Sequence, residues 1–384
     1  MAQTLMSDRR MMERQMADRG YRIGIEREGL RTDADGCIAL TPHPSEFGER
    51  LENFRIGTDF GEAMLEFRTK PQPDTESCYQ ELLEVTKEAL KVLHERGEYL
   101  WPYSMPCRIP DESAFCYNSY PEHPEEEDFE RLLTSIYGIR RMSISGIHFN
   151  FSVSDEMHGY LRVRYPGVPE DKDEAYMRCC RNLLKYGQLI QYFLDASPTD
   201  LDGHLAEANS FRNSPDGYRC EKAKTLDFSS KQAYAESVSR LKRYERFGPV
   251  RAKSAQKKNM DAGILISGVN RIEVRFCDIN PFDICGVSRQ DLDFMTALLF
   301  LCMTKEEASE TGLDTPAHLL EGCMRMNREL SLGLDEGLDA MRRDLESGQK
   351  RSDKVRELIQ RHGLDGFLML AAEYDRAAAS PESA

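Results

Sequence analysis

The sequence lacks the features that would place the chain in a membrane or on a nucleic acid. No apolar run in its 384 residues approaches the about 20 residues that a membrane-spanning helix needs. Positive charge is in deficit, because 51 Lys and Arg residues stand against 66 Asp and Glu residues and leave a net charge of −15. That balance opposes binding to a nucleic-acid backbone or to an anionic membrane. We therefore expect neither partner, and a metal-dependent nuclease is disfavoured.

The eleven cysteines lack the spacing of a metal site. No CxxC pair occurs, so we do not expect a zinc site built from cysteines. The N-terminal segment 1–20 is charged and rich in methionine, and it has no apolar signal core. Without a secretory signal, the cysteines are expected to be reduced thiols in a cytoplasmic protein.

Internal repeats and low-complexity segments are also missing, and the length is sufficient for a sizeable core. We expect a charged N-terminal segment (1–20), a single domain (21–375) whose last part (286–375) is helical, and a disordered tail (376–384). The sequence leaves the oligomeric state open, and a monomer is compatible with it.

Three segments before residue 286 carry helix patterns. Residues 73–97 have apolar side chains at helical spacing, with Thr75 as the expected N-cap and Gly97 as the stop. The run PEEEDFERLL (124–133) is expected to open a helix at its acidic end, where carboxylates suit the helix dipole. Residues 173–198 predict one long helix.

Three other stretches alternate polar and apolar residues, which is typical of strands with one face in the core. They are GIEREGLR (24–31), SGIHFNFSV (145–153) and NRIEVRFCDINPF (270–282). Their polar positions can simply face water, as in half-exposed antiparallel strands. Solvated faces are usually filled with Lys, Glu and Thr, however, whereas these carry ligands for metals and phosphates. The polar positions include Glu26, Glu28, His148, Asn150, Glu273 and Arg275.

A fourth stretch, RIGTDFGEAMLEFRTKP (55–71), adds Asp59, Glu62 and Glu66. The offset between Asp59 and Glu66 is odd, so one regular strand would place them on opposite faces. They can meet only if a turn or bulge intervenes, and Gly61 is the expected place for it. The part GEAMLEF also fits helical spacing, and the pattern alone leaves this alternative open.

Gathered on one sheet surface, Glu26, Glu28, Glu66 and Glu273 would repel one another unless cations lay between them. Oxygen ligands with one imidazole suit Mg²⁺ or Mn²⁺, and Mg²⁺ commonly bridges carboxylates to nucleotide phosphates. Arg275 could then stabilise a transferring phosphoryl group. Because no GxxxxGK[ST] loop occurs, we expect ATP to be held through the metal and not by a P-loop.

Six segments together resemble bacterial glutamate–cysteine ligases, also called γ-glutamylcysteine synthetases. They span roughly residues 20–300 and read GIEREGLR, TDFGEAMLEFRTKP, WPYSMPC, SISGIHFNFS, SFRNSPDGY and NRIEVRFCDINPF. The resemblance implies an α+β, glutamine-synthetase-like fold with a concave antiparallel sheet, helices on its outer face and a helical C-terminus. It implies that ATP phosphorylates the γ-carboxylate of glutamate, and that the amine of cysteine attacks the acyl phosphate. Since no ATP-grasp segment is seen, we expect the dipeptide γ-glutamylcysteine as the only peptide product.

The resemblance also implies roles for individual residues. Arg212 corresponds to a position suited to binding a substrate carboxylate, although a surface salt bridge is the alternative. Arg251 and Lys253 correspond to a basic stretch near the nucleotide, or else lie in a solvated loop. The implied metal ligands are Glu26, Glu28, Asp59, Glu66, His148 and Glu273, the implied catalytic residues are Arg275, Glu28 and Glu66, and Arg275 also contacts the nucleotide.

The resemblance also implies residues on the side of the acceptor. The residues implied to bind substrates, beside Arg212, are Phe60, Phe129, Leu133, Asn150, Tyr218 and Phe247. Phe129 and Phe247 stand where relatives are expected to have tyrosine, so a phenolic hydroxyl is missing at both positions. Each of these apolar side chains can equally belong to the core. Two alternatives therefore stay open: a ligase with a different amine or amino-acid acceptor, and a non-catalytic homologue that binds ATP and metal and regulates a partner.

Overall fold

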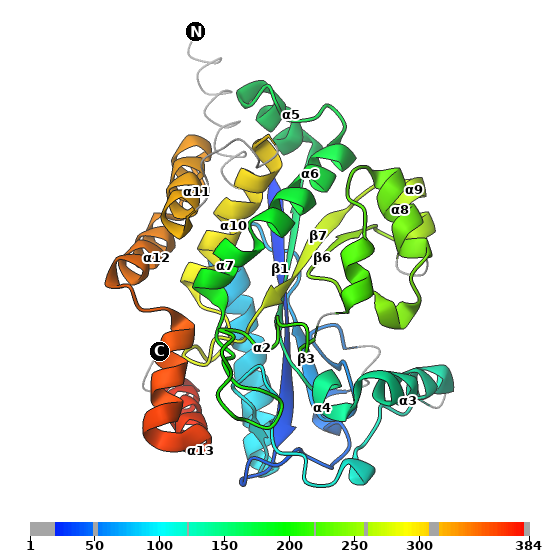
Figure 1. Cartoon of the computed structure of the whole chain (residues 1–384), viewed down its shortest axis with the longest axis vertical. Coiled ribbons are helices and arrows are strands. Elements are labelled where there is room, and N and C mark those ends of the chain that lie inside the picture. Colours follow the sequence, from blue (N-terminus) through cyan, green and yellow to red (C-terminus); the bar gives the residue numbers. More distant parts are fainter. Residues whose placement is uncertain are drawn as a thin grey trace.

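A seven-stranded antiparallel sheet forms the centre of the molecule in the part of the chain that is described (Figure 1). The computed structural model describes residues 20–48, 53–120, 123–218, 220–256, 260–306 and 315–379. The spatial order is β2-β3-β1-β5-β7-β6, and β4 pairs with the end of β1. The strands are β1 (Tyr21–Thr32), β2 (Ile56–Thr58), β3 (Met64–Arg68), β4 (Tyr99–Leu100), β5 (Ile147–Val153), β6 (Val250–Lys253) and β7 (Arg271–Cys277).

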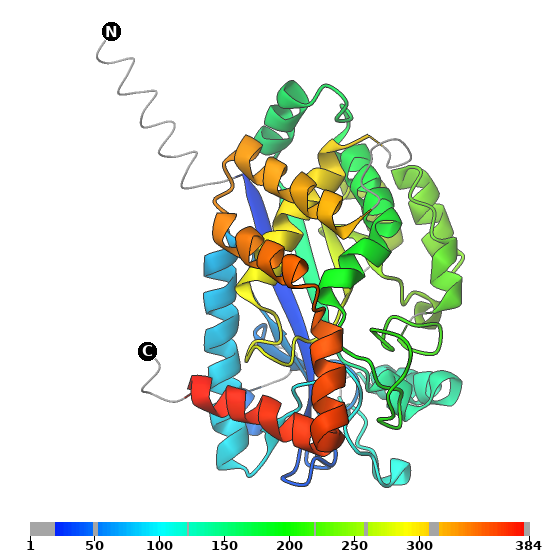
Figure 2. The same ribbon diagram turned by 60° about the vertical axis from the view of Figure 1, so that its left-hand side comes forward.

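Helices cover one face of this sheet, and α11 and α12 lie outside α10 (Figure 2). Helix α13 contains a kink at Gly363, whose φ of 71° is not helical. The helices are α2 (Thr75–Glu95), α3 (Pro124–Tyr137), α4 (Ile139–Met142), α5 (Asp155–Arg164), α6 (Lys172–Lys185), α7 (Gly187–Leu194), α8 (Lys231–Ser239), α9 (Met260–Ser267), α10 (Arg289–Thr304), α11 (Pro316–Leu330), α12 (Asp335–Ser347) and α13 (Arg351–Ala379), with short 3-10 turns at Ser45–Phe47, Glu112–Ala114, Glu221–Thr225 and Arg243–Glu245.

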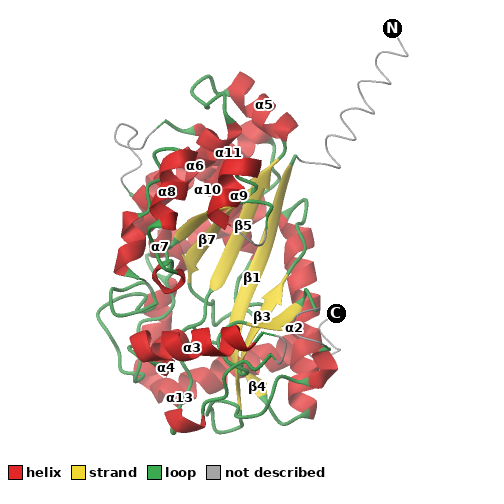
Figure 3. Cartoon of the chain, turned by 90° about the vertical axis from the view of Figure 1, so that its right-hand side faces the viewer, coloured by secondary structure: helices red, strands yellow, loops and turns green. Residues whose placement is uncertain are grey.

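The main core lies between the sheet and these helices. Alternate residues of the central strands, such as Ile25, Phe151 and Val274, are buried on the helix side. Helix α10 is buried along most of its length, as expected for a helix that is apolar all round. Its Phe300 meets the rings of Tyr21 and Phe151 edge-on, with centroid distances of 5.3 and 5.2 Å. The polar positions of the same strands are thereby turned to the opposite face, which Figure 3 shows with α10 and α6 behind it.

The ambiguous stretch 55–71 forms a hairpin and not a helix. Strands β2 and β3 pair through a turn in which Gly61 has a φ of 71°. A Cβ atom on Gly61 would lie 2.5 Å from Cζ of Phe115, so the turn requires glycine for both its backbone and its packing. The turn that Asp59 and Glu66 need in order to meet is therefore present at the predicted residue.

Three expectations about helices need correction. The N-cap of α2 is Asp74 and not Thr75, because the Asp74 carboxylate accepts a hydrogen bond from Ser77 N at 2.7 Å. The expected long helix 173–198 is two helices, α6 and α7, which are separated at Tyr186, next to Gly187, a residue of low helix propensity. Helix α13 extends to Ala379, so residues 376–379 are helical, and residues 380–384 lie outside the described part.

The helical character expected for 286–375 is present in the described residues of that range. The charged segment expected at 1–20 falls outside the described residues except for Gly20. Among the helices that are described, none has both the length and the apolar character needed to cross a membrane.

We expect Phe300→Ala to lower the free energy of unfolding by about 3–5 kcal/mol, because it removes a fully buried ring at the contact between α10 and the sheet. Chemical denaturation measures this loss. Val163→Ala, at a side chain that is 85% exposed on α5, serves as the control and should change the value by no more than about 0.5 kcal/mol. A loss below about 1 kcal/mol in Phe300→Ala would contradict the packing described.

Candidate active site

The polar residues of neighbouring strands form one continuous row because of the register of the sheet. Glu28 on β1 lies directly opposite Glu66 on β3. Glu26 lies opposite His148 on β5. Glu273 on β7 lies between Asn150 and Arg251 of the strands on either side. Antiparallel pairing thus brings side chains from five strands onto one surface, which faces the viewer in Figure 3.

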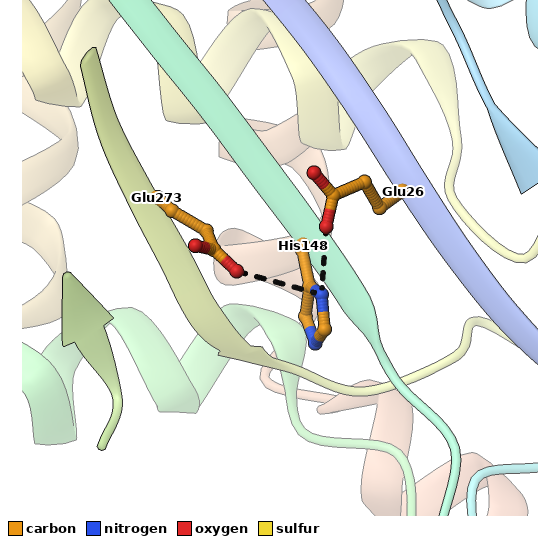
Figure 4. A group of neighbouring side chains, drawn as sticks. All are labelled: Glu26, His148 and Glu273. Atoms are coloured by element: carbon orange, nitrogen blue, oxygen red, sulfur yellow. Dashed lines mark hydrogen bonds and ion pairs between the residues drawn. The ribbon is translucent and has the colours of Figure 1, made fainter. Parts of the chain in front are cut away.

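His148 is the centre of this surface (Figure 4). Its Nδ1 lies 3.2 Å from Oε2 of Glu26 and 3.8 Å from Oε1 of Glu273. Glu26, His148 and Glu273 each offer one ligand atom within 4.8 Å of the others. On the other side of the ring, Nε2 lies 3.3 Å from Oε1 of Glu28. The imidazole therefore contacts three carboxylates that come from two strands.

His148 is suited to ligate a metal through a neutral ring. Burial and the charge of Arg275 lower the pKa of His148 to about 4, despite the carboxylates beside it. A neutral imidazole keeps a lone pair for a cation. Nε2 of His148 and Oε1 of Glu28 are both buried and make no hydrogen bond within the described residues. Two ligand atoms that have lost water without gaining a hydrogen bond fit a site that receives a cation.

Two facing carboxylates, Glu28 on β1 and Glu66 on β3, are crowded enough to disfavour their own ionisation. Burial, with the charge of Asp59, raises the pKa of Glu28 to about 8. Burial, with the charge of Glu26, raises the pKa of Glu66 well above its usual value. Glu28 nevertheless accepts a hydrogen bond from Gly146 N at 2.8 Å through its second oxygen. The added charge of a divalent cation would favour the ionised carboxylates, so this acidic half of the surface fits Mg²⁺ or Mn²⁺.

The other half of the surface, on β6 and β7, is basic. Burial acts to raise the pKa of Glu273, but the charges of Arg275 and Lys253 outweigh it and hold that pKa well below its usual value. Lys253 Nζ lies 2.5 Å from Oε2 of Glu273, and Arg275 pairs with Oε1. Arg275 also donates to the hydroxyl of Tyr218 at 3.1 Å. Arg251 and Lys253 belong to a paired strand, so the solvated-loop alternative for them is wrong.

Arg212 is buried beneath this surface. Its side chain is 1% exposed, and its Nη2 donates to the backbone carbonyl of Arg275 at 2.8 Å. The guanidinium also lies over the ring of Tyr218, 5.4 Å from the centroid. Only a glycine fits at Gly146, because a Cβ atom there would lie 2.1 Å from Nη2. The alternative of a surface salt bridge for Arg212 is therefore wrong, and the guanidinium lies next to the backbone that carries Arg275.

Asn150 lies within the same row and contacts the candidate ligands directly. Its Nδ2 donates to Oε1 of Glu26 at 3.0 Å, and its Oδ1 accepts from Arg271 Nε at 2.9 Å. Asn150 thus connects the acidic half to a further cation of the basic half. Arg271 was not among the expected site residues, although its alternate position on β7 marks it as a member of the polar row.

The apolar residues expected on the acceptor side gather at a second core cluster: Phe60 and Leu133 belong to it, and Phe129, Tyr218 and Phe247 pack against it. Phe60 stacks on Phe115, with ring centroids 5.2 Å apart. Tyr218 and Phe247 lie 5.3 Å apart, and Tyr218 joins this cluster to Arg275. Leu133 is buried on α3. Phe129, on the same helix, packs against Arg243, whose guanidinium carbon lies 3.9 Å from the ring centroid.

Glu130 is a residue of this region that the sequence pattern did not single out. Its carboxylate accepts from Gly61 N at 3.2 Å, from Asn118 N at 2.9 Å and from Asn118 Nδ2 at 2.7 Å. Asn118 in turn donates to the backbone carbonyl of Asp59 at 3.0 Å. Glu130 therefore fastens the turn that carries Asp59 to helix α3. In the sequence, Glu130 lies in the acidic run 124–133, whose pattern indicates only the start of a helix.

Comparison with known families identifies the chain. The profile of the family described as Glutamate-cysteine ligase matches residues 9–225 and 241–317. The chain belongs to the glutamate–cysteine ligase family. A glutamate–cysteine ligase of Clostridium acetobutylicum is 31% identical over 351 residues, which cover 75% of this chain and 72% of that protein. The family resemblance seen in the six sequence segments is thus confirmed.

Many relatives in the family are longer. The bifunctional glutathione biosynthesis protein of Clostridium perfringens is 30% identical over 322 residues, and the match covers 76% of this chain but 41% of that protein. The chain therefore spans less than half the length of this relative. The solved glutamate–cysteine ligase of Francisella tularensis, in complex with AMP, superposes with a TM-score of 0.78 at 21% identity and covers 95% of this chain and 90% of that one. This likeness confirms the expected α+β fold with its antiparallel sheet and C-terminal helices.

We expect Glu28→Gln to weaken binding of Mn²⁺ by at least about tenfold, because the amide keeps the shape and the Gly146 contact but removes a charged ligand atom. Electron paramagnetic resonance of free Mn²⁺ measures the affinity. Glu95→Gln, at an exposed position on α2, is the matched control and should bind as the wild type does. Equal affinity in Glu28→Gln and wild type would remove Glu28 from the metal ligands.

We expect Glu130→Gln to lower Mn²⁺ affinity as well, by about tenfold, because an amide cannot accept all three N–H groups and the turn carrying Asp59 is released. The free energy of unfolding should fall by about 1–3 kcal/mol. Glu127→Gln, on the same helix and in an exposed pair with Arg131, should change neither quantity appreciably. A Glu130→Gln protein that is destabilised but binds Mn²⁺ normally would show that Glu130 has only a structural role.

Proposed function

We propose that the chain catalyses the ATP-dependent ligation of the γ-carboxylate of L-glutamate to the amino group of L-cysteine. The products are γ-glutamylcysteine, ADP and phosphate, as in the first step of glutathione biosynthesis. The observation that carries this proposal is the division of one polar sheet face into an acidic half and a basic half with neutral His148 between them. Membership of the glutamate–cysteine ligase family supports it.

The acidic half is suited to hold the metal that ATP requires. Its proposed ligands are Glu26, Glu28, Asp59, Glu66 and His148, from β1, the β2–β3 hairpin and β5. Glu273 of β7, which also pairs with Lys253 and Arg275, is the proposed ligand from the basic half. Bound there, Mg²⁺ or Mn²⁺ would offset the negative charge of the nucleotide phosphates. The AMP bound to the Francisella relative is consistent with a nucleotide site on this fold.

The basic half is suited to hold the phosphates from the other side. Arg251, Lys253 and Arg275 come from adjacent strands and point to the same row. In the first proposed step, an oxygen of the γ-carboxylate of glutamate attacks the γ-phosphorus of ATP, and the bond to ADP breaks. Arg275 would then stabilise the charge on the transferred group, since Glu273 and Tyr218 hold its guanidinium in place.

The second proposed step forms the peptide-like bond. The amino nitrogen of the acceptor attacks the acyl carbon of γ-glutamyl phosphate, phosphate leaves, and the nitrogen loses a proton. Arg212 is proposed to help hold a substrate carboxylate, since its Nε makes no hydrogen bond among the described residues and the side chain lies under the phosphate-binding strand. We further propose that residues 21–375 form a single catalytic domain that acts in the cytoplasm, where glutamate, cysteine and ATP occur together.

The second apolar cluster is the part of the site where the acceptor is proposed to bind. Phe129 and Phe247 bring no hydroxyl to it, and Arg243 covers a face of the Phe129 ring. Glu126 holds Arg243 in turn, with N–O distances of 3.2 and 2.7 Å. Because Arg243 is already paired, cysteine is proposed as the acceptor on the strength of family membership. Another amino acid as the acceptor remains the second candidate because of the two missing hydroxyl groups.

An assay of ADP and phosphate release tests the proposal. We expect release to require glutamate, Mg²⁺ and an acceptor together, with cysteine preferred in a panel that includes other amino acids and simple amines. Arg275→Lys should lower kcat by about 10²- to 10³-fold, because lysine cannot reproduce the planar contacts to Glu273 and Tyr218.

Arg240→Lys, at an exposed pair with Glu236, is the control and should retain full activity. Release that is stimulated by a different acceptor and not by cysteine would favour the second candidate. ATP binding without turnover for any acceptor, in wild type and in Glu26→Ala alike, would overturn the enzymatic proposal in favour of a regulatory homologue.

A further inference from the structure

A cavity of about 320 Å³ opens on the helix-covered side of the molecule, away from the polar sheet face. It lies between the end of α7, the start of α10, the end of α12 and the start of α13. The position can be followed in Figure 1 where α12 leads into α13. The loop after β7 forms the remaining wall through Asn280 and Phe282. Its volume is at the lower end of the range for small-molecule sites.

Two lysines at this cavity have no acidic partner. Lys350 and Lys354 make no ion pair within the described ranges, although the whole chain has a net charge of −15. The neighbouring cation, Arg351, is paired with Asp291 at 2.6 Å. Asp344, an acidic residue of the lining, instead accepts a hydrogen bond from Gln290 at 2.8 Å. The ammonium groups of the two lysines are therefore available to an anionic ligand.

Aromatic rings hold both ammonium groups at the cavity. Lys350 Nζ lies 4.8 Å from the ring centroid of Tyr192, and Lys354 Nζ lies 4.1 Å from that of Phe282. A cation placed over a ring face is attracted by it, so the two side chains are restrained without being neutralised. The amides of Asn280 and Gln349 line the same space and add hydrogen-bonding groups. Restrained ammonium groups with amide neighbours are suited to phosphate oxygens.

We propose that this cavity is a second anion site, separate from the active site, which binds a phosphate-bearing small molecule through the ammonium groups of Lys350 and Lys354. The walls connect it to the polar face. Tyr192 is followed by the loop that carries Arg212, and Phe282 follows the strand that carries Arg275. Asp278 fastens the two loops together, since it accepts hydrogen bonds from Ala196 N at 2.8 Å and from Ser197 Oγ at 2.7 Å. A ligand in the cavity would tie the start of α13 to both loops.

Hydrogen–deuterium exchange with pyrophosphate as the probe tests this site, with sodium chloride at equal ionic strength as the reference. We expect pyrophosphate to protect peptides from residues 341–356 and 280–290 in the wild type. Lys350→Met combined with Lys354→Met should weaken this protection at least tenfold in a titration, since methionine keeps the length of the side chain and removes its charge. Lys91→Met, at an exposed position on α2, should leave the titration unchanged.

Pyrophosphate bound at the polar face would protect β6 and β7 and should do so equally in the double variant, so the two sites are measured separately. No protection of 341–356 in the wild type, or equal protection in the double variant, would overturn the proposal. Equal protection by citrate, which carries carboxylates only, would overturn the assignment to phosphate.

Discussion

Repulsion among buried carboxylates is the constraint on which the rest of the structure depends. Glu28 and Glu66 lie directly opposite each other on β1 and β3, and burial raises the pKa of both. Such a pair is unfavourable unless positive charge is brought to it. Among the described residues, Arg68 comes within 3.5 Å of Glu66 but does not offset the burial of this pair, whereas Lys253 and Arg275, on the far side of His148, already pair with Glu273. We propose that an external cation supplies the missing positive charge in the acidic half.

Packing of the core determines which face of β1 carries the carboxylates. Glu26 and Glu28 face away from the helices because Ile23 and Ile25 face toward them. A shift of β1 by one residue would exchange the two faces and place the carboxylates against the apolar side. The contacts of α10 with Tyr21 and Phe151 oppose that shift, since they are made only in the observed register. The packing on one face thus fixes the geometry of the chemistry on the other.

Alternation of polar and apolar residues made the strands and the polar row predictable, because both follow from a local period of two. Local pattern does not say which strands are neighbours, so the facing of Glu28 and Glu66 needed either the fold or the family resemblance. The choice between helix and hairpin around Gly61 is decided by strand pairing, because β3 pairs with both β2 and β1. Glu130 was not predicted as a site residue because local pattern does not show its partners: Gly61 is 69 residues away, and Asn118 lies 12 residues earlier, outside the helix. Asp74 and Thr75 can both cap α2, and only the hydrogen bond from Ser77 N to the Asp74 carboxylate shows which of them is the N-cap.

The cations of the polar face and those of the cavity differ in whether a carboxylate is already paired with them, and this difference bears on how each would bind phosphate. On the polar face, Glu273 stays ionised between Arg275 and Lys253, so a phosphate arriving there must share cations that are already held. Because the phosphate would share these cations with Glu273, it would gain less binding free energy. The same pairing holds the guanidinium of Arg275 in position, so no rearrangement is needed during phosphoryl transfer, which favours turnover over retention of the ligand. Lys350 and Lys354 have no such competitor among the described residues and only aromatic rings to restrain them. An anion there would not compete with an acidic partner for either ammonium group, as suits a site that retains its ligand. Cations of the same type would therefore serve transfer on one side of the sheet and binding on the other.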